Sequence, residues 1–177
     1  MKIPIVFVLG FAVMALARAA PFEEANPEND QTEKNDLAKR YWWCSSGWTY
    51  IGGACFKYVP TAMTWAIAEK NCRSMSAHLA SVQSIDEYHS IQKMIADATH
   101  EYKQTWIGGS DAQHEGVWLW SDGETMKFTK WCKGEPNNHK RQQHCILMNH
   151  GDQKCWDDSE CNVLLPSVCV QRGSFWG

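Results

Sequence analysis

Two short stretches of the chain carry side chains that could bind a hard metal ion. The first is Glu135-Pro136-Asn137 and the second is Asp157-Asp158. Calcium takes several oxygen ligands, and carboxylates and amides supply them. If the fold brings the two stretches together, they predict a Ca²⁺ site. A bland alternative is that the paired aspartates form a solvated turn that binds no ion.

The same carboxylates do not make a convincing enzyme active site. Glu135 and Asp157 have the residue types of an acid and base pair. No activated nucleophile, oxyanion motif or cofactor-binding loop accompanies them in the sequence. We therefore predict a binding protein without catalytic residues. Histidines 139, 144 and 150 are scattered over polar segments, so we expect them to be exposed and not to form a zinc site.

The composition describes one modest globular domain. The chain has 177 residues, 44% of them hydrophobic, with 17 Lys and Arg against 20 Asp and Glu, a net charge of -3. Binding to nucleic acid depends on a basic surface that neutralises phosphates. A chain with this balance lacks such a surface, and we expect no nucleic-acid partner.

The first 40 residues differ in character from the rest. Residues 1–19 combine a positive start, a short apolar run and small residues, as in a cleaved secretory signal peptide. Residues 20–40 are acidic and almost free of aromatic residues, so we expect a disordered propeptide or linker. Whether the chain is cleaved after the dibasic pair Lys39-Arg40 stays open. We predict secretion and no membrane span, because no later stretch is as hydrophobic.

Residues 41–177 must therefore hold the folded domain, and their pattern predicts an α+β fold. Apolar periodicity favours a helix over residues 61–75, with Thr64 as cap and a buried face made by Met63, Ile67, Ala68 and Cys72. It favours a second helix over residues 84–96, with Ser84 as cap and with Ile85, Tyr88, Ile91 and Ile95 facing inward. Alternating apolar residues between turn signals favour strands. These strands span residues 48–51, 54–59, 105–107, 117–120, 128–131, 145–148, 154–156 and 167–170. Trp106, Trp118, Trp120 and Trp156 are expected to be core residues on these strands.

The eight cysteines all lie in this domain, and in a secreted chain they favour disulfides over metal ligation. No Cys-x-x-Cys pair is present, which also argues against thiolate zinc. Eight cysteines allow 105 pairings, and spacing alone does not choose among them.

Several ordered motifs resemble those of the C-type lectin domain over residues 44–171. The motifs are TAMTWAIAEKNC, HLASV, WIGG, VWLWSDG, WCKGEPNN, HCILMN and CWDDSEC. Within that family the chain looks most like secreted single-domain fish lectins of the ladderlectin and nattectin types, and like type II antifreeze proteins. The resemblance implies two helices, a mixed or antiparallel pair of sheets with long loops, and four disulfides. By the family pattern these are Cys44–Cys55, Cys72–Cys169, Cys132–Cys155 and Cys145–Cys161.

The resemblance also implies a calcium site, with a cis peptide bond before the proline of Glu135-Pro136-Asn137. The implied ligands are Glu135, Asn137, Gln143, Asp157 and Asp158. Gln143 stands where the family has Glu, and Asp157 where it has Asn. The two changes cancel in charge, so we expect the site to keep its attraction for calcium.

A sugar is the ligand that the resemblance implies. The residues expected to contact it are Glu135, Asn137, His139, Gln143 and Asp157. The Glu-Pro-Asn sequence is typical of mannose-type selectivity, and the next loop offers no Trp for galactose to stack on, although galactose stays possible. Expected targets are microbial glycans, and the oligomeric state is not determined by the sequence.

Two other functions stay open within the same family. The Cys132 and Cys155 pair is shared with type II antifreeze proteins, which makes ice binding an alternative. The charge and bulk of His139, Lys140, Arg141 and His144 argue against a flat ice-binding surface. Recognition of a protein partner by the same scaffold is a further alternative.

Overall fold

The computed structural model describes residues 44–173. The predicted signal peptide at 1–19, the acidic segment at 20–40, and Trp42, Trp43 and Trp176 lie outside these residues. The described chain has two α-helices, α2 (Trp65–Ser74) and α3 (Ile85–Thr99), and a short 3₁₀ helix, η1 (His139–Arg141). Neither α-helix is long and apolar enough to cross a membrane.

Eight strands form one network of backbone pairing. Their bounds are β1 (Thr49–Ile51), β2 (Ala54–Met63), β3 (His78–Leu79), β4 (Thr105–Ser110), β5 (Leu119–Trp120), β6 (Cys145–His150), β7 (Cys155–Ser159) and β8 (Leu165–Arg172). The order is β1-β2-β8-β4-β6-β7, with β3 paired to β8 and β5 to β4. All pairs are antiparallel except β4 with β8. Two helices, a mixed sheet and four disulfides confirm the predicted α+β fold class.

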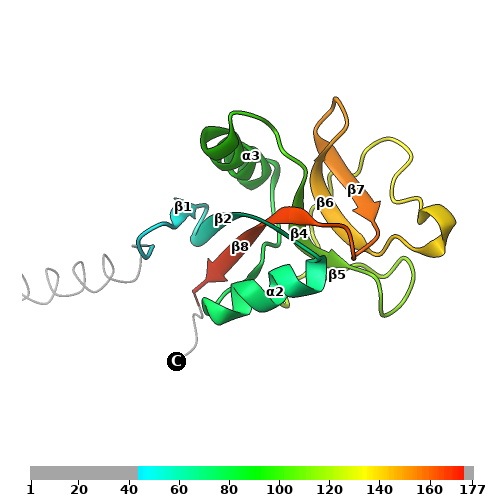
Figure 1. The fold of residues 1–177 in the computed structure, drawn as a ribbon, viewed down its shortest axis with the longest axis horizontal. Helices are drawn as coiled ribbons and strands as arrows, with labels where there is room; N and C mark the ends of the chain where they lie inside the picture. Colours follow the sequence, from blue (N-terminus) through cyan, green and yellow to red (C-terminus); the bar gives the residue numbers. More distant parts are fainter. Residues whose placement is uncertain (1–43, 174–177) are drawn as a thin grey trace, which may run out of the picture. The chain divides into compact units, whose positions relative to one another are not determined.

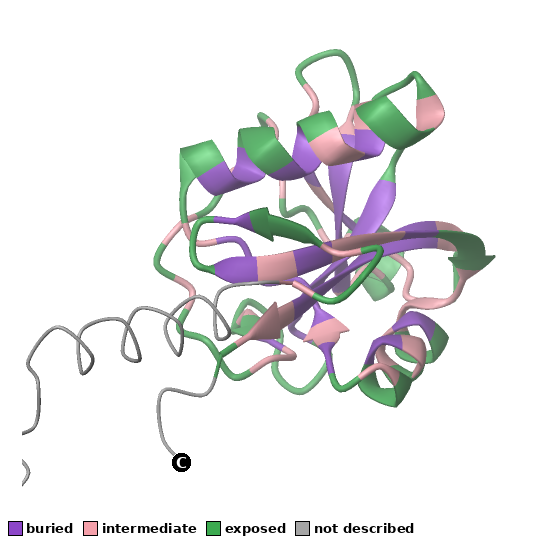
Figure 2. Ribbon diagram, turned by 90° about the vertical axis from the view of Figure 1, so that its left-hand side faces the viewer, coloured by how far each residue is buried: buried purple, intermediate pink, exposed green. Residues whose placement is uncertain are grey.

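The helices lie on opposite sides of the strands, and β6, β7 and the long loops extend away from them (Figure 1). Helix α3 turns its buried residues toward the strands and its exposed residues outward (Figure 2). The helix begins after Ser84, whose hydroxyl accepts a hydrogen bond from the Glu87 N–H at 3.1 Å. This confirms the predicted cap, since a serine in this position satisfies a free N–H of the first turn.

The predicted start of the first helix is wrong by several residues. Strand β2 continues to Met63, which pairs with Leu165 of β8, and α2 begins only at Trp65 after Thr64. Pairing with a strand distant in sequence therefore overrides the local helical pattern. Thr64 occupies the cap position, but its side chain makes no capping hydrogen bond.

Two predicted inward residues face solvent. Ile67 is 52% exposed and Ile85 is 39% exposed. Helix α2 buries Ala68 and Cys72, one turn apart, as predicted, and Ile67 precedes that row by one residue, which rotates it about 100° away. Ile85 is the first residue of α3, and the buried row of that helix starts at Glu87 and Tyr88 and includes the predicted Tyr88, Ile91 and Ile95.

Two of the predicted strands are shortened or absent. Only Leu119 and Trp120 of the segment 117–120 form a strand, so Trp118 lies outside it. The segment 128–131 contributes a single isolated bridge, between Trp131 and Trp156. Strand β3 was not predicted at all. These aromatic segments reach the core through side chains from loops, which apolar periodicity does not distinguish from strand pairing.

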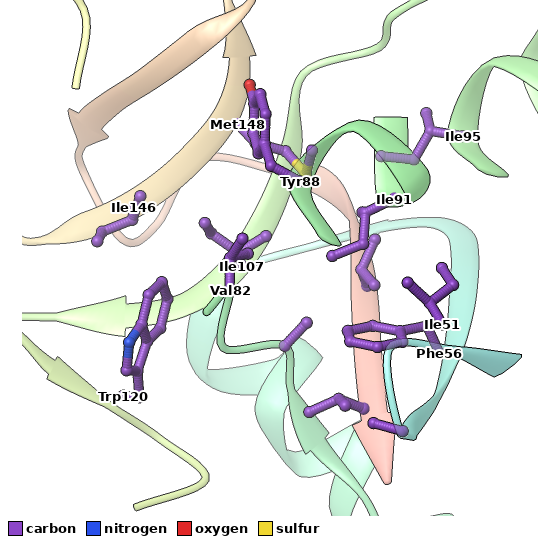
Figure 3. Close-up of a cluster of buried hydrophobic side chains, with 14 of the residues drawn as sticks. Ile51, Phe56, Val82, Tyr88, Ile91, Ile95, Ile107, Trp120, Ile146 and Met148 are labelled. Atoms are coloured by element: carbon purple, nitrogen blue, oxygen red, sulfur yellow. The ribbon is translucent and has the colours of Figure 1, made fainter. Parts of the chain in front are cut away.

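The main core gathers around Trp156 of β7. The indole packs edge-on against Tyr88, Trp120, Phe128 and Trp131, with ring centroids 5.6 to 6.3 Å apart. Figure 3 shows a part of this cluster with aliphatic and aromatic side chains, in which residues of α3 lie beside residues of the strands. Aromatic residues dominate core energetics because each buries a large area. The core therefore fixes the strand that carries Asp157 and Asp158.

The four disulfides join the pairs that the family resemblance implied. They are Cys44–Cys55, Cys72–Cys169, Cys132–Cys155 and Cys145–Cys161. The last two tie both sides of the long loop at residues 133–144 to the ends of β7. The two disulfides thus attach the loop covalently to β7, the strand that carries Asp157 and Asp158.

Candidate functional site

Asp157 and Asp158 lie on strand β7, which pairs with β6. Ile146 pairs with Asp158 and Leu147 with Asp157. Asp158 is completely buried, and the Asp157 side chain is 13% exposed. Because side chains alternate along a strand, Asp158 shares the buried side with Trp156.

The loop between Cys132 and Cys145 meets this strand through Asp158. The backbone N–H of Asn137 donates to Asp158 Oδ1 at 2.9 Å, and that of Asn138 donates to Oδ2 at 2.7 Å. The Glu135-Pro136 peptide bond is cis, as the resemblance implied. Charge-assisted bonds of this kind are stronger than neutral ones. Asp158 therefore holds the loop in place.

Three carboxylates meet where the loop joins the strand. Oxygen atoms of Glu135, Asp157 and Asp158 all lie within 4.8 Å of one another. Glu135 Oε2 is buried and has no hydrogen-bond partner among the described residues. A buried polar atom without a partner is costly, and clustered negative charges repel. The set therefore fits a hard divalent cation, which would satisfy the unpaired oxygen and offset the charge.

The crowding changes the protonation of two of the three groups. Burial is the main cause that raises the pKa of Glu135 above its ordinary value, followed by the charge of Asp157, and a hydrogen bond with the Asn137 side chain opposes the rise. Burial likewise raises the pKa of Asp157, while the nearby His150 opposes it. His150 Nδ1 lies 3.1 Å from Asp157 Oδ2. Without a cation, the site therefore holds protons more tightly than isolated carboxylates do.

Gln143 and His139 lie in the turn beside the carboxylates. Gln143 Oε1 accepts a hydrogen bond from the His139 backbone N–H at 2.7 Å, and the backbone N–H of Gln143 donates to Asn138 Oδ1 at 3.1 Å. No hydrogen bond joins Gln143 to Glu135 or to an aspartate of the site in the described part of the chain. The side-chain nitrogen of Gln143, Nε2, is the group that stays available to a ligand.

Of the predicted site residues, the structure thus brings four directly together. They are Glu135, Asn137, Asp157 and Asp158. Gln143 uses its side-chain oxygen for a hydrogen bond within the loop, with the backbone N–H of His139 as the donor. The His139 side chain is exposed.

A second cluster near the loop was missed in the sequence. Asp111, Glu115 and His144 carry potential ligand atoms within 4.8 Å of one another. His144 Nδ1 lies 3.0 Å from the buried Asp111 Oδ1, so the expectation of an exposed histidine is wrong here. Asn138 links this cluster to the site through a hydrogen bond to Glu115. The spacing of two acids after a strand was the available signal, but the histidine comes from a distant segment.

The comparisons with known proteins agree with this fold. The family model described as Lectin C-type domain matches residues 61–171. Ladderlectin of Oncorhynchus mykiss is 41% identical over 129 residues, which are 73% of this chain and 68% of that protein. The galactose-specific lectin nattectin of Thalassophryne nattereri is 36% identical over 129 residues, 73% of this chain and 80% of nattectin.

A solved structure adds a relative with a different activity. The Ca²⁺-free form of a Ca²⁺-dependent type II antifreeze protein superposes with a TM-score of 0.68 at 35% identity. The match covers 72% of this chain and 99% of that one. The relatives of this chain thus include proteins named as lectins and a protein named as an antifreeze protein.

Proposed function

The chain belongs to the C-type lectin domain family, and from that membership we propose that it is a secreted, calcium-dependent lectin with mannose-type selectivity. Members of this family are binding proteins and not enzymes. The observation that carries the proposal is the group of three carboxylates with an unpaired buried oxygen on Glu135. A lectin of this kind needs that charge arrangement to hold its ion.

The ion would be held mainly by Glu135, Asp157 and Asp158, with Asn137 beside them. When bound, calcium would supply direct coordination of neighbouring hydroxyl groups of a sugar. The carboxylates keep a total of three negative charges, so we expect the site to still attract calcium although Gln143 and Asp157 replace the usual Glu and Asn. Asp158 serves twice, since it also holds the loop that carries Glu135.

The side chains at the rim decide how the sugar hydroxyls are bonded. Gln143 offers its amide N–H as a donor because its oxygen is already used by His139. Asp157 offers only acceptor oxygens when ionised. The donor and the acceptor around one hydroxyl are thereby exchanged relative to the usual family arrangement, and neither hydrogen bond is lost. We expect sugar binding with altered affinity.

Mannose-type sugars are favoured over galactose. The residues that come after Asn137 are Asn138, His139, Lys140 and Arg141, and none provides an indole on which the apolar face of galactose could stack. Nattectin is described as galactose-specific, so galactose is the competitor to include in every assay. Secretion by the segment 1–19 would bring the site to microbial glycans outside the cell, where several linked copies would raise avidity.

Calorimetry on the chain without its signal peptide tests the proposal. Mannose and galactose are titrated in calcium and in EDTA, beside capture on immobilised mannan with EDTA elution. We expect calcium-dependent heat with mannose and release from mannan by EDTA. Glu135→Gln should abolish both, whereas Glu124→Gln, an exposed residue of the loop at 121–130, should change neither. Absence of heat with both sugars, or capture that EDTA does not reverse, would reject the proposal.

Ice binding is a second candidate, supported by the match to a type II antifreeze protein of similar fold. The exposed His139, Lys140 and Arg141 speak against a flat, weakly polar surface beside the site. Thermal hysteresis of the purified protein, with and without calcium, separates the two functions. A lectin without antifreeze activity gives none in either buffer.

A further inference from the structure

The turn after Asn137 holds an unusual backbone conformation. Asn138, Lys140 and Arg141 have φ angles of 41°, 57° and 59°. Glycine adopts this left-handed region without strain, and asparagine tolerates it, but lysine and arginine do so at a cost. Backbone geometry alone would therefore favour glycine at residues 140 and 141. Strain of this kind gathers at ligand sites, which makes the two side chains candidates for a function.

The two basic side chains have no partner within the described chain. Lys140 and Arg141 are exposed, and neither forms an ion pair or a side-chain hydrogen bond among residues 44–173. Arg172, by contrast, is paired with Glu87 at 3.1 Å. Lys140 and Arg141 thus form no direct ion pair with the three carboxylates of the site.

The turn is joined to the carboxylate site by two consecutive hydrogen bonds. The Asn138 N–H donates to Asp158 Oδ2 at 2.7 Å, and the Arg141 N–H donates to the Asn138 carbonyl at 2.8 Å. His139 is bonded to Gln143 on the other side of the turn. The backbone of the turn that carries Lys140 and Arg141 is therefore tied directly to the carboxylate site, in a chain whose net charge is -3.

We infer that Lys140 and Arg141 bind a phosphate or sulfate ester carried by the sugar whose hydroxyls occupy the carboxylate site. Arginine matches such tetrahedral oxyanions with paired N–H groups, and lysine contributes a mobile charge. The preferred ligand is then an anionic glycan, bound more tightly than the neutral sugar. This inference rests on the proposed lectin function, because the carboxylate site must hold the neutral part of the same sugar.

Calorimetry in calcium with mannose, mannose-6-phosphate and mannose-6-sulfate provides the test. We expect wild-type protein to bind at least one ester at least about tenfold more tightly than mannose, which corresponds to one or two charge-assisted contacts. The gain should shrink as salt is raised, since exposed charges are screened. The two esters show whether the turn distinguishes phosphate from sulfate.

Matched variants assign the gain to the turn. Lys140→Gln with Arg141→Gln should remove the gain and leave mannose affinity unchanged. Lys70→Gln with Lys127→Gln removes the same charge from exposed residues on α2 and in the loop at 121–130, and should preserve the gain. A third variant, Lys140→Gly with Arg141→Gly, should also lose the gain while its unfolding temperature rises, because glycine relieves the backbone strain.

The outcomes separate the inference from the function beneath it. Equal affinity for mannose and both esters would overturn the inference and leave the lectin proposal intact. A gain that survives the Lys140 and Arg141 variants would also overturn it, since the anion would then lie elsewhere. Absence of calcium-dependent binding to all three sugars would overturn the inference together with the proposed function.

Discussion

Asn138 donates its backbone N–H to Asp158 Oδ2 at 2.7 Å across 20 residues of sequence. The other carboxylate oxygen accepts the N–H of Asn137 at 2.9 Å. One buried side chain of β7 thus closes the binding loop onto the sheet through two bonds. The same side chain is one of the three carboxylates that we propose to hold calcium, so the position of the loop and the binding of the ion depend on one residue.

Asp158→Asn should weaken the loop as well as the metal site. An amide has a single oxygen, so only one of the two N–H groups keeps an acceptor, and a lost buried bond costs about 1–3 kcal/mol. We expect a lower urea midpoint in EDTA and loss of calcium binding by calorimetry. The exposed Asp152→Asn is the control and should match wild type. An unchanged midpoint for Asp158→Asn would show that these bonds do not hold the loop.

Stability without calcium should fall as the pH rises. The pKa values of Glu135 and Asp157 are raised above the ordinary 4.5 and 3.8, so the folded state binds protons more tightly than the unfolded state. Stability from these groups is therefore greatest at low pH and is lost as the pH rises from those ordinary values through the raised ones.

Urea unfolding between about pH 4 and about pH 7 measures this effect. In EDTA, the free energy of unfolding of wild type relative to Glu135→Gln should decline with rising pH. Saturating calcium should reverse the slope, because binding favours the ionised carboxylates of the folded state. A wild-type and variant difference that is flat across the range would contradict the assigned cause.

Residues 143 and 157 should compensate each other in calcium affinity. Gln143→Glu adds a negative charge and should tighten calcium binding, whereas Asp157→Asn removes one and should weaken it, each by about tenfold or more. The double variant should return near wild type. Calorimetric titration of calcium into the four proteins forms a double-mutant cycle. If Gln143→Glu has no effect, residue 143 does not reach the ion and serves only the hydrogen bond to His139.

The disulfides should differ in their contribution to stability according to the length of chain they close. Cys72 and Cys169 are 97 residues apart and both fully buried, and Cys44 and Cys55 are 11 apart. The chain-entropy model assigns about 5 kcal/mol to the long loop and about 3 kcal/mol to the short one. Replacing each pair by alanine and measuring urea unfolding checks the order. A larger loss for the short loop would show that local packing outweighs chain entropy.

The sequence predicted the features that local interactions determine. The start of α3 depends on the hydrogen bond between Ser84 and Glu87, which lies three residues later, and it was predicted correctly. The two acidic stretches were visible because their residue types belong to calcium chemistry, and the resemblance supplied the disulfide pairs. These features need at most a few neighbouring residues or a known pattern to be recognised.

Tertiary structure decided what depends on contacts between distant segments. Strand β2 continues through Met63 because β8 pairs with it, and Trp131 reaches Trp156 from a loop without forming a strand. The oxygen of Gln143 is directed to His139 by the closed turn, and His144 meets Asp111 only where two strand ends come together. A one-dimensional pattern records which groups exist, but the direction of each side chain is fixed by the packing of the whole domain.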